Sequence, residues 1–376
     1  MYIWQAPGWP GLIWDANAIT APLAQARLAQ GRMLGLASGL GMMDLAKLQL
    51  AGWTQEALAT AQIEGEQLQL NSVRASAARR LGLADASALA RDPRTEATLD
   101  VLQAAVSRWE HPLREQDLFD WHAALFPTGR SGATRITTGG WRTHEEPMQI
   151  VTPRIGKPDV VHYEAPPSTE VAAQMRALLE WFNTHSRVPE VDGLVRAAVA
   201  HLWFEAVHPF EDGNGRIGRA VAELALAQDM RSDQRLFSLS AQLAQDRAGY
   251  YSQLQAATGQ PRLDVTPWVQ WFVGRIQAAF EAATSQMQKA LAHGRYWAQV
   301  NAKHPGLSAS QRKALTRLLE AGPEGFAGGM STEKYVNLTG VSRATAYREL
   351  TQLTELGLVE RTGVGRGTRY EVGMPA

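Results

Sequence analysis

The 376-residue chain contains no cysteine, which excludes disulfide scaffolds, thiolate metal sites and a cysteine nucleophile. It also lacks net charge, because 37 basic and 37 acidic residues cancel. No overall field therefore draws it to nucleic acid or membranes, and any affinity for nucleic acid must be local. No uninterrupted apolar run approaches about 18 residues, and the start MYIWQAPGWPGLIWD lacks the basic flank and apolar stretch of a signal peptide. We expect a cytoplasmic protein with no membrane partner.

The length exceeds one ordinary core and predicts two or three domains, at roughly 100 to 200 residues per domain. Changes of pattern along the chain place an N-terminal region over residues 1–95, a central domain over residues 96–290 and a small domain over residues 300–376. The N-terminal region opens with an irregular cap rich in Trp, Pro and Gly. No repeat with a period of 20 to 50 residues is present, which excludes a solenoid.

Helical periodicity dominates the chain, so the predicted fold class is mainly α. Helical spacing of apolar residues begins near Pro22, with breaks expected near Gly39 to Gly41 and at Gly52. It continues over Thr98 to Leu125 and, after an irregular stretch, returns from Thr169 to about His293. The helices are expected to form one catalytic or binding core with a helical N-terminal region beside it.

The segment with the most chemical character is HPFEDGNGRIGR, His208 to Arg219. Gly213 and Gly215 let the backbone turn so that successive amides point at an anion. The residues that follow have the pattern of a helix start, where phosphate oxygens bind well. Arg216 and Arg219 lie three residues apart on that helix, so both can reach a polyphosphate. The segment therefore predicts a polyphosphate site.

Two more side chains of this segment suit a transfer reaction. Asp212 can hold a hard cation such as Mg²⁺ that bridges phosphates, and His208 has the titration range of a general base. The substring GNGRIG, Gly213 to Gly218, also matches the GxGxxG dinucleotide fingerprint. That fingerprint requires a preceding strand, whereas Leu194 to Ala206 have apolar residues at helical spacing. A dinucleotide-binding fold is therefore rejected.

The same segment resembles the Fic-family signature HPFx(D/E)GNGRxxR at every fixed position, and the resemblance extends over roughly Thr98 to Ala283. The family implies a helical fold and adenylylation, the transfer of AMP from ATP to a protein hydroxyl. By this resemblance His208 is the base that activates a Ser, Thr or Tyr hydroxyl of a target protein, and Asp212 is the Mg²⁺ ligand. Phe210 resembles the core anchor beneath the loop. The implied ATP-binding positions in the loop, which include the phosphate nest and the arginines for the β and γ phosphates, are Gly213, Asn214, Gly215, Arg216, Gly218 and Arg219.

Two short β-branched runs, Met148 to Thr152 and Val160 to Tyr163, predict a hairpin between helices. By the same resemblance it is a flap that registers the target's backbone by strand addition, and an ordinary hairpin that closes the bundle is the alternative. The same resemblance implies that Tyr251 contacts the adenine base. The alternative is that the adjacent Tyr250 and Tyr251 are simply one core and one surface residue of a helix. The flap arm adds four candidate ATP contacts: Val160, Val161, His162 and Tyr163.

In LATAQIEGEQL, Thr60, Glu64 and Gly65 fit the (S/T)xxxE(G/N) pattern of the inhibitory helix of Fic proteins. We expect Glu64 to pair with Arg219, drawing that guanidinium from the γ phosphate and adding negative charge where ATP is negative. A solvated helix with a surface glutamate is the alternative. The resemblance also implies a possible homodimer, and the same Glu64 could position a water that removes AMP.

The small domain carries helix-turn-helix patterning. Ser331 to Gly340 can form a short helix, and Ser342 can cap a second helix with Ala346, Leu350 and Leu353 on one face. The tail VERTGVGRGTRYEV then resembles the two strands and Gly-rich tip of a winged helix. Five arginines of this domain could meet DNA phosphates or base edges: Arg343, Arg348, Arg361, Arg366 and Arg369. Winged helices also dock proteins, and an inert cap is a third interpretation.

Three activities thus compete. An adenylyltransferase would need ATP and Mg²⁺ and would lose activity in His208→Ala. A transcriptional regulator whose Fic core senses nucleotide would bind DNA regardless of His208. Transfer of UMP or phosphate, in place of AMP, is the third. The intact set His208, Asp212, Arg216 and Arg219 favours the enzyme.

Overall fold

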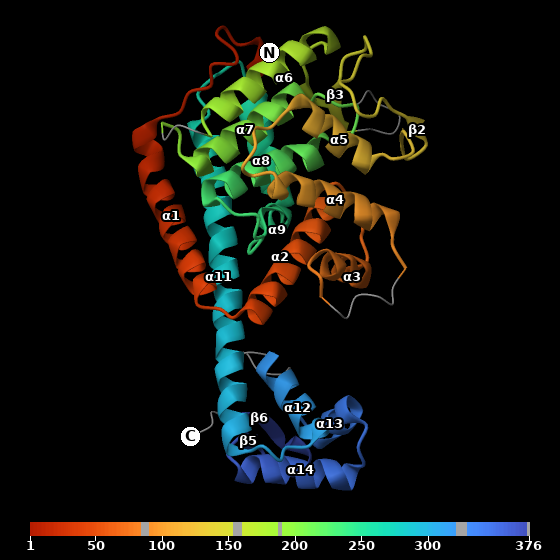
Figure 1. Ribbon diagram of the computed structural model, residues 1–376, viewed down its shortest axis with the longest axis vertical. Helices are drawn as coiled ribbons and strands as arrows, with labels where there is room; N and C mark the ends of the chain where they lie inside the picture. The colour runs from red at the N-terminus through yellow and green to blue at the C-terminus, as the bar shows by residue number, and fades with distance from the viewer. Residues whose placement is uncertain (84–89, 153–159, 187–189, 321–328, 374–376) are drawn as a thin grey trace. The chain divides into compact units, whose positions relative to one another are not determined.

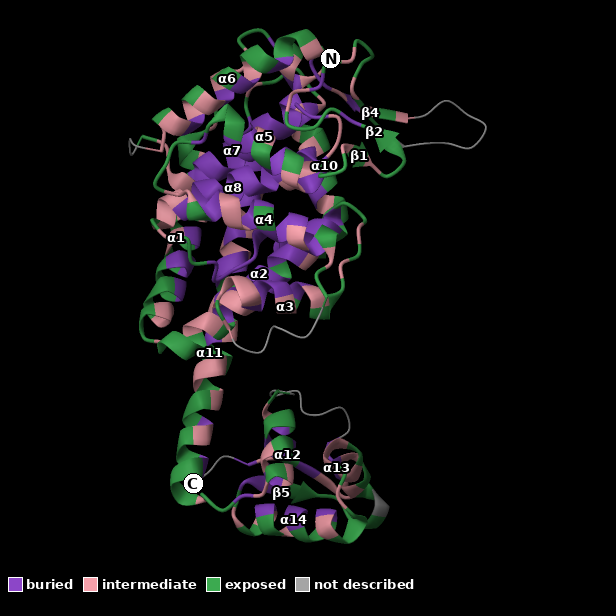
Figure 2. Ribbon diagram, turned by 45° about the vertical axis from the view of Figure 1, so that its right-hand side comes forward, coloured by how far each residue is buried: buried purple, intermediate pink, exposed green. Residues whose placement is uncertain are grey.

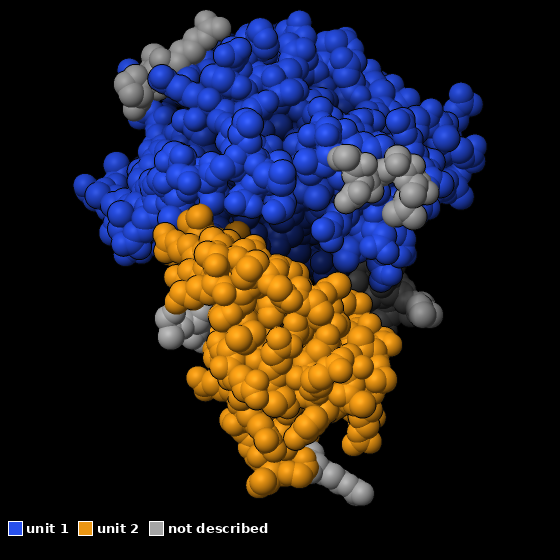
Figure 3. All heavy atoms as spheres, turned by 60° about the horizontal axis from the view of Figure 1, so that its bottom comes forward, with its two compact units in different colours: residues 1–287 blue, residues 288–376 orange. Residues whose placement is uncertain are grey.

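The computed structural model describes residues 1–83, 90–152, 160–186, 190–320 and 329–373 (Figure 1). The chain divides into two compact units, Met1–Met287 and Gln288–Ala376, which are coloured separately in Figure 3. Both are built mainly from helices, as the sequence predicts, and the described strands form two-stranded sheets. None of the described helices is long and apolar enough to span a membrane.

The N-terminal helices are longer than the sequence suggests. A short 3-10 turn, η1 (Ile3–Gln5), precedes α1 (Ala16–Ser38), α2 (Met42–Ile63) and α3 (Leu70–Arg80). The break expected near Gly39 to Gly41 separates α1 from α2, but the break expected at Gly52 is wrong, since that residue lies inside α2. A Cβ at Gly52 would lie 2.6 Å from the carbonyl oxygen of Arg235. The glycine therefore allows close backbone packing and does not end the helix.

The stretch predicted as continuously helical over Thr98 to Leu125 contains two helices, α4 (Pro93–Ser107) and α5 (Glu115–Leu125). Pro112 lies between them, and its missing N–H and fixed φ do not suit a helix interior. After α5 come the short strands β1 (Arg130–Ser131) and β2 (Thr134–Arg135).

The predicted hairpin is confirmed as an antiparallel pair, β3 (Gln149–Thr152) and β4 (Val160–Glu164), with a register shift between Ile150 and Val151. Beyond it lie α6 (Ser168–Thr184), α7 (Gly193–Val207), α8 (Asn214–Met230), α9 (Leu239–Gln245) and α10 (Arg247–Thr258). Every residue from Leu194 to Val207 is buried, and α7 and α8 form the centre of the unit (Figure 2). A helix that is apolar all round suits such a central position.

Helix α11 (Thr266–Lys303) continues past His293, where the periodicity was expected to end. Gly294 directly after His293 does not end the helix, and no proline follows before Pro305, so the helix extends to just before that proline.

The C-terminal unit confirms the helix-turn-helix and wing patterns. It contains α12 (Ala309–Glu320), α13 (Thr332–Thr339), α14 (Arg343–Glu355) and the antiparallel pair β5 (Val359–Thr362) and β6 (Arg369–Val372). Ser331 and Ser342 cap α13 and α14 through their hydroxyls. The predicted inward face of α14 consists of Ala346, Leu350 and Leu353. These residues are buried in one cluster with Tyr335 and Tyr370.

Candidate active site

The loop between α7 and α8 is locked by its own residues. His208 has a left-handed backbone with φ of 50°, and Gly213 has φ of 81°. A Cβ at Gly213 would lie 2.8 Å from the ring of Phe126, so only glycine fits there without displacing that ring. Asn214 bonds the backbone of Phe210 in both directions, at 2.8 and 2.9 Å. Phe210 is fully buried and stacks on His122, as expected of a core anchor.

His208 occupies the start of this loop, and its imidazole is buried. Burial, reinforced by the Arg142 guanidinium, lowers the pKa of the imidazole from 6.5 to about 4. The same guanidinium also fixes the backbone of His208, because Arg142 Nε donates to the His208 carbonyl at 2.8 Å. A neutral imidazole at physiological pH can accept a proton from a hydroxyl.

Glu205 is a buried carboxylate beside His208 that the sequence patterns did not single out. One of its oxygens lies 4.0 Å from His208 Nδ1. Burial raises the pKa of Glu205 to about 8, against the opposing effect of the Arg219 charge. A lone acidic residue within the apolar run of α7, three positions before His208, is the signal that could have identified it.

Asp212 lies at the exposed side of the loop. Its carboxylate accepts a hydrogen bond from the Ser131 hydroxyl and another from Gly213 N at 2.5 Å, and its side chain is 43% exposed. Among the described residues no cluster of three or more His, Cys, Asp or Glu could hold a metal ion. Asp212 therefore offers one carboxylate, which is the donor set of an Mg²⁺ ion held largely by phosphates and water.

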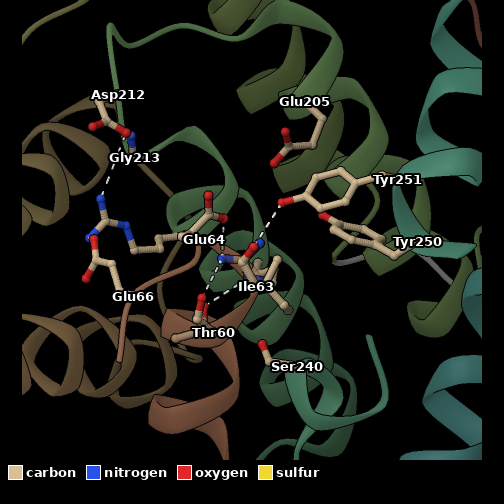
Figure 4. A network of polar contacts seen from close by, with 12 residues as sticks. Thr60, Ile63, Glu64, Glu66, Glu205, Asp212, Gly213, Ser240, Tyr250 and Tyr251 are labelled. Carbon is tan, nitrogen blue, oxygen red and sulfur yellow. Dashed lines mark hydrogen bonds and ion pairs between the residues drawn. The ribbon is translucent and has the colours of Figure 1, made fainter. Parts of the chain in front are cut away.

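Arg219 contacts Glu64, the partner expected from the sequence, and also Thr60 of the same motif. Arg219 Nη2 lies 2.7 Å from Glu64 Oε1, and Arg219 Nε donates to Thr60 Oγ1 at 2.9 Å (Figure 4). The guanidinium is 1% exposed. Glu64 thus reaches Arg219 from the end of α2, across 155 positions of sequence. Gly65 follows with φ of 79°.

A cavity of about 690 Å³ is lined by several of the site residues predicted from the sequence. Tyr251 is at its wall, with its hydroxyl bonded to the carbonyl of Ile63 at 3.1 Å. Tyr163 is mostly buried, and its hydroxyl donates to Ala206 O at 2.6 Å. The predicted residues that line this cavity are Glu64, His162, Tyr163, His208, Gly215, Arg219 and Tyr251.

Other predicted contacts lie outside that lining. Val160 and Val161 belong to β4, with Val161 41% exposed. Gly218 packs α8 against α7, where a Cβ would lie 2.6 Å from Glu205 Oε1. Arg216 lines a second cavity of about 480 Å³, in which Arg94 and Arg130 also lie. The two arginines of the loop therefore face different cavities.

Comparison with known proteins agrees with this geometry. Residues 112–226, which include the whole loop, match the Fic/DOC family. The chain therefore contains a Fic/DOC domain over residues 112–226. Upstream of this Fic domain, residues 2–83 match a domain of unknown function, DUF4172. Downstream, residues 326–373 match the C-terminal domain of a transcriptional regulator described as DIP2311-like.

Two relatives carry the name protein adenylyltransferase fic-1. The protein adenylyltransferase fic-1 of Caenorhabditis briggsae is 28% identical over 148 residues, which cover 39% of this chain and 26% of that protein. The protein of the same name from Caenorhabditis elegans is 31% identical over 118 residues, covering 31% of this chain and 21% of that protein. The match thus spans about a quarter of these relatives. A Fic family protein from Desulfovibrio desulfuricans G20 shares the fold, with a TM-score of 0.54 at 22% identity over 96% of this chain and 97% of that one.

Proposed function

We propose that this protein is an adenylyltransferase that moves AMP from ATP onto a Ser, Thr or Tyr hydroxyl of a target protein. The observation that carries the proposal is the neutral, buried imidazole of His208 in one cavity with Arg219 and Gly215. A cavity of about 690 Å³ is of the size that accommodates a nucleotide. The named fic-1 relatives support this choice of reaction over other transfers.

In the proposed reaction His208 takes the proton of the attacking hydroxyl. Nδ1 of the ring is buried, so Nε2 is the nitrogen left to accept it. The hydroxyl oxygen bonds to the α phosphorus, the bond to the β-phosphate oxygen breaks, and pyrophosphate leaves. The amides of Gly213 to Gly215 hold the α phosphate, and Arg216 and Arg219 neutralise the leaving phosphates. Catalysis is then mainly positioning and charge stabilisation.

The Mg²⁺ ion that the resemblance implies fits Asp212. Its carboxylate is oriented by Ser131 and by Gly213 N, yet its side chain remains 43% exposed. When bound, Mg²⁺ would neutralise phosphate charge and favour the leaving group.

Glu64 supplies the proposed brake. Its contact with Arg219 occupies the guanidinium meant for the γ phosphate, so ATP binds without a productive arrangement. Glu64 could also position a water that attacks the AMP adduct, which makes the reverse reaction, deadenylylation, compatible with the same site.

The proposal is tested by incubating wild type, Glu64→Gly and Glu64→Gly/His208→Ala with α-labelled ATP and Mg²⁺. Self-modification stands in for a target protein, and mass spectrometry reads the gain of one AMP. We expect label in Glu64→Gly alone. Equal label in all three proteins would refute both the brake and the role of His208, and label in none would refute the adenylyltransferase.

A second function belongs to the C-terminal unit, in which α14 exposes Arg343, Tyr347 and Arg348. The match to a transcriptional regulator supports DNA as its partner, so the chain could couple a nucleotide-sensing Fic domain to DNA binding. Docking of a protein on the same helix is the alternative.

A further inference from the structure

The end of α2 is closed by a glycine cap that fixes the two residues on either side of it. Gly65 adopts φ of 79° and donates from its N–H to Gln62 O at 3.0 Å. Glu66 N then donates to Ala61 O at 2.9 Å. These two bonds are the pattern of a helix that ends in a left-handed glycine. All of the donors and acceptors are backbone atoms, so the cap itself needs no glutamate side chain.

This cap places two carboxylates on two neighbouring arginines. Glu64, at the last position before the glycine, reaches Arg219 at 2.7 Å. Glu66, just after it, reaches Arg216, with Oε1 3.0 Å from Nη1. The arginines are three positions apart on α8 and so lie on one face of that helix. The turn at Gly65 therefore places Glu64 and Glu66 so that each carboxylate reaches one of the two arginines.

Arg216 is held in place independently of Glu66. Its side chain is only 10% exposed, its guanidinium lies over the Phe126 ring at 5.1 Å from the centroid, and Asp212 Oδ1 lies 4.0 Å away. Glu66 is 33% exposed. The buried arginine is the fixed partner and Glu66 is the side chain that can leave.

We propose that Glu66 is a second inhibitory carboxylate, which occupies Arg216 while Glu64 occupies Arg219. The inference rests on the proposed function, since it assigns phosphates to both arginines. ATP must then displace two carboxylates held by one cap, and removal of Glu64 alone leaves Arg216 paired. The cavity of about 480 Å³ beside Arg216 contains Arg94 and Arg130, which offer the displaced Glu66 carboxylate other cationic partners.

Binding to the full chain tests this directly. Calorimetry with ATP and with AMP, both with Mg²⁺, compares wild type with Glu66→Gln, which keeps the backbone cap. We expect ATP affinity to rise about two- to fivefold, as for a partly exposed ion pair. AMP affinity should stay unchanged, because AMP lacks the phosphates assigned to Arg216. Glu110→Gln, which removes an exposed charge elsewhere, serves as the matched control and should bind as wild type does.

Self-labelling provides the second readout. Glu64→Gly/Glu66→Gln should label about two- to fivefold faster than Glu64→Gly at ATP concentrations below saturation. Unchanged ATP affinity in Glu66→Gln, or an equal gain for AMP, would overturn the role of Glu66 while the adenylyltransferase stands. Tighter ATP binding without label in any variant would leave Glu66 as a phosphate competitor and remove the proposed reaction.

Discussion

Tyr251 is tied to the inhibitory segment although resemblance assigns it to the adenine base. Its hydroxyl donates to the carbonyl of Ile63, the residue before Glu64. Tyr251→Phe removes this bond and keeps the ring, so the end of α2 should detach more readily. A net hydrogen bond of about 0.5 to 1.5 kcal/mol corresponds to a two- to tenfold rise in self-labelling. Tyr335→Phe, whose lost hydroxyl bond to Glu349 lies in the C-terminal unit, should not change labelling. A slower Tyr251→Phe would instead assign the hydroxyl to nucleotide binding.

The protonation of His208 gives a second prediction for a single residue. Burial lowers its pKa to about 4, and only the neutral ring can act as the base. As far as it depends on His208, the rate of self-labelling by Glu64→Gly should therefore be constant from pH 6 to about 8. It should fall as the pH drops below about 5. The charge of Glu64 raises the pKa of His208, so its removal shifts the fall to lower pH. Initial rates across this range decide the question. A half-maximal rate near pH 6.5 would contradict a buried imidazole.

Residues that share a short motif were predictable, and residues that meet through the fold were not. His208, Asp212 and the loop arginines lie within one segment, and Thr60, Glu64 and Gly65 within another, so the resemblance of each segment to a Fic-family motif picked out both sets. The contacts of Arg142, Ser131 and Glu66 with the loop join distant positions. Such contacts depend on how helices pack and leave no periodicity in the sequence. The buried Glu205 did leave a trace, as the one acidic residue in an otherwise mostly apolar helix.

At the scale of elements, the attachment of α2 determines where Glu64 and Glu66, the two proposed inhibitory carboxylates, lie. Gly52 permits this attachment, since a Cβ there would lie 2.6 Å from Arg235 O. Gly52→Ala should destabilise the protein by about 1 to 3 kcal/mol through overpacking, although alanine favours helix by about 1 kcal/mol. Gly35→Ala in α1 meets nothing within 4 Å and should be neutral or stabilising. Urea unfolding of both variants makes the comparison, and equal stability would show that α2 tolerates a wider spacing.

The same contrast explains which elements the sequence predicted. The hairpin β3 to β4 and the caps of α13 and α14 follow from local residue types, and all were confirmed. The continuity of α2 at Gly52 depends on Arg235, almost two hundred positions away, and local rules therefore failed there. Helix α5 begins after Pro112, a breaker that apolar periodicity over Thr98 to Leu125 had concealed.

For the molecule as a whole, net charge gives no guidance to partners, because acidic and basic residues are equal in number. Charge distribution within one element is more informative. On α14 Arg343 and Tyr347 are exposed one turn apart and Arg348 is exposed beside them, whereas Ala346, Leu350 and Leu353 are buried. Two guanidinium groups on an exposed helix after a turn suit phosphate and base-edge contacts. The full chain is therefore expected to bind duplex DNA in spite of its neutrality.

The last prediction concerns that binding. Duplexes are first selected from a random pool with the full chain. They should bind Arg343→Ala/Arg348→Ala more weakly than wild type. The magnitude of the slope of log affinity against log salt concentration should be smaller by about 2, one for each lost phosphate contact. Arg32→Ala, an exposed arginine on α1, controls for charge. Because His208 lies in the other unit, His208→Ala should bind as wild type does. If no duplex is selected while Glu64→Gly still labels itself, DNA binding by the C-terminal unit is refuted, and protein docking and an inert cap remain as its alternatives.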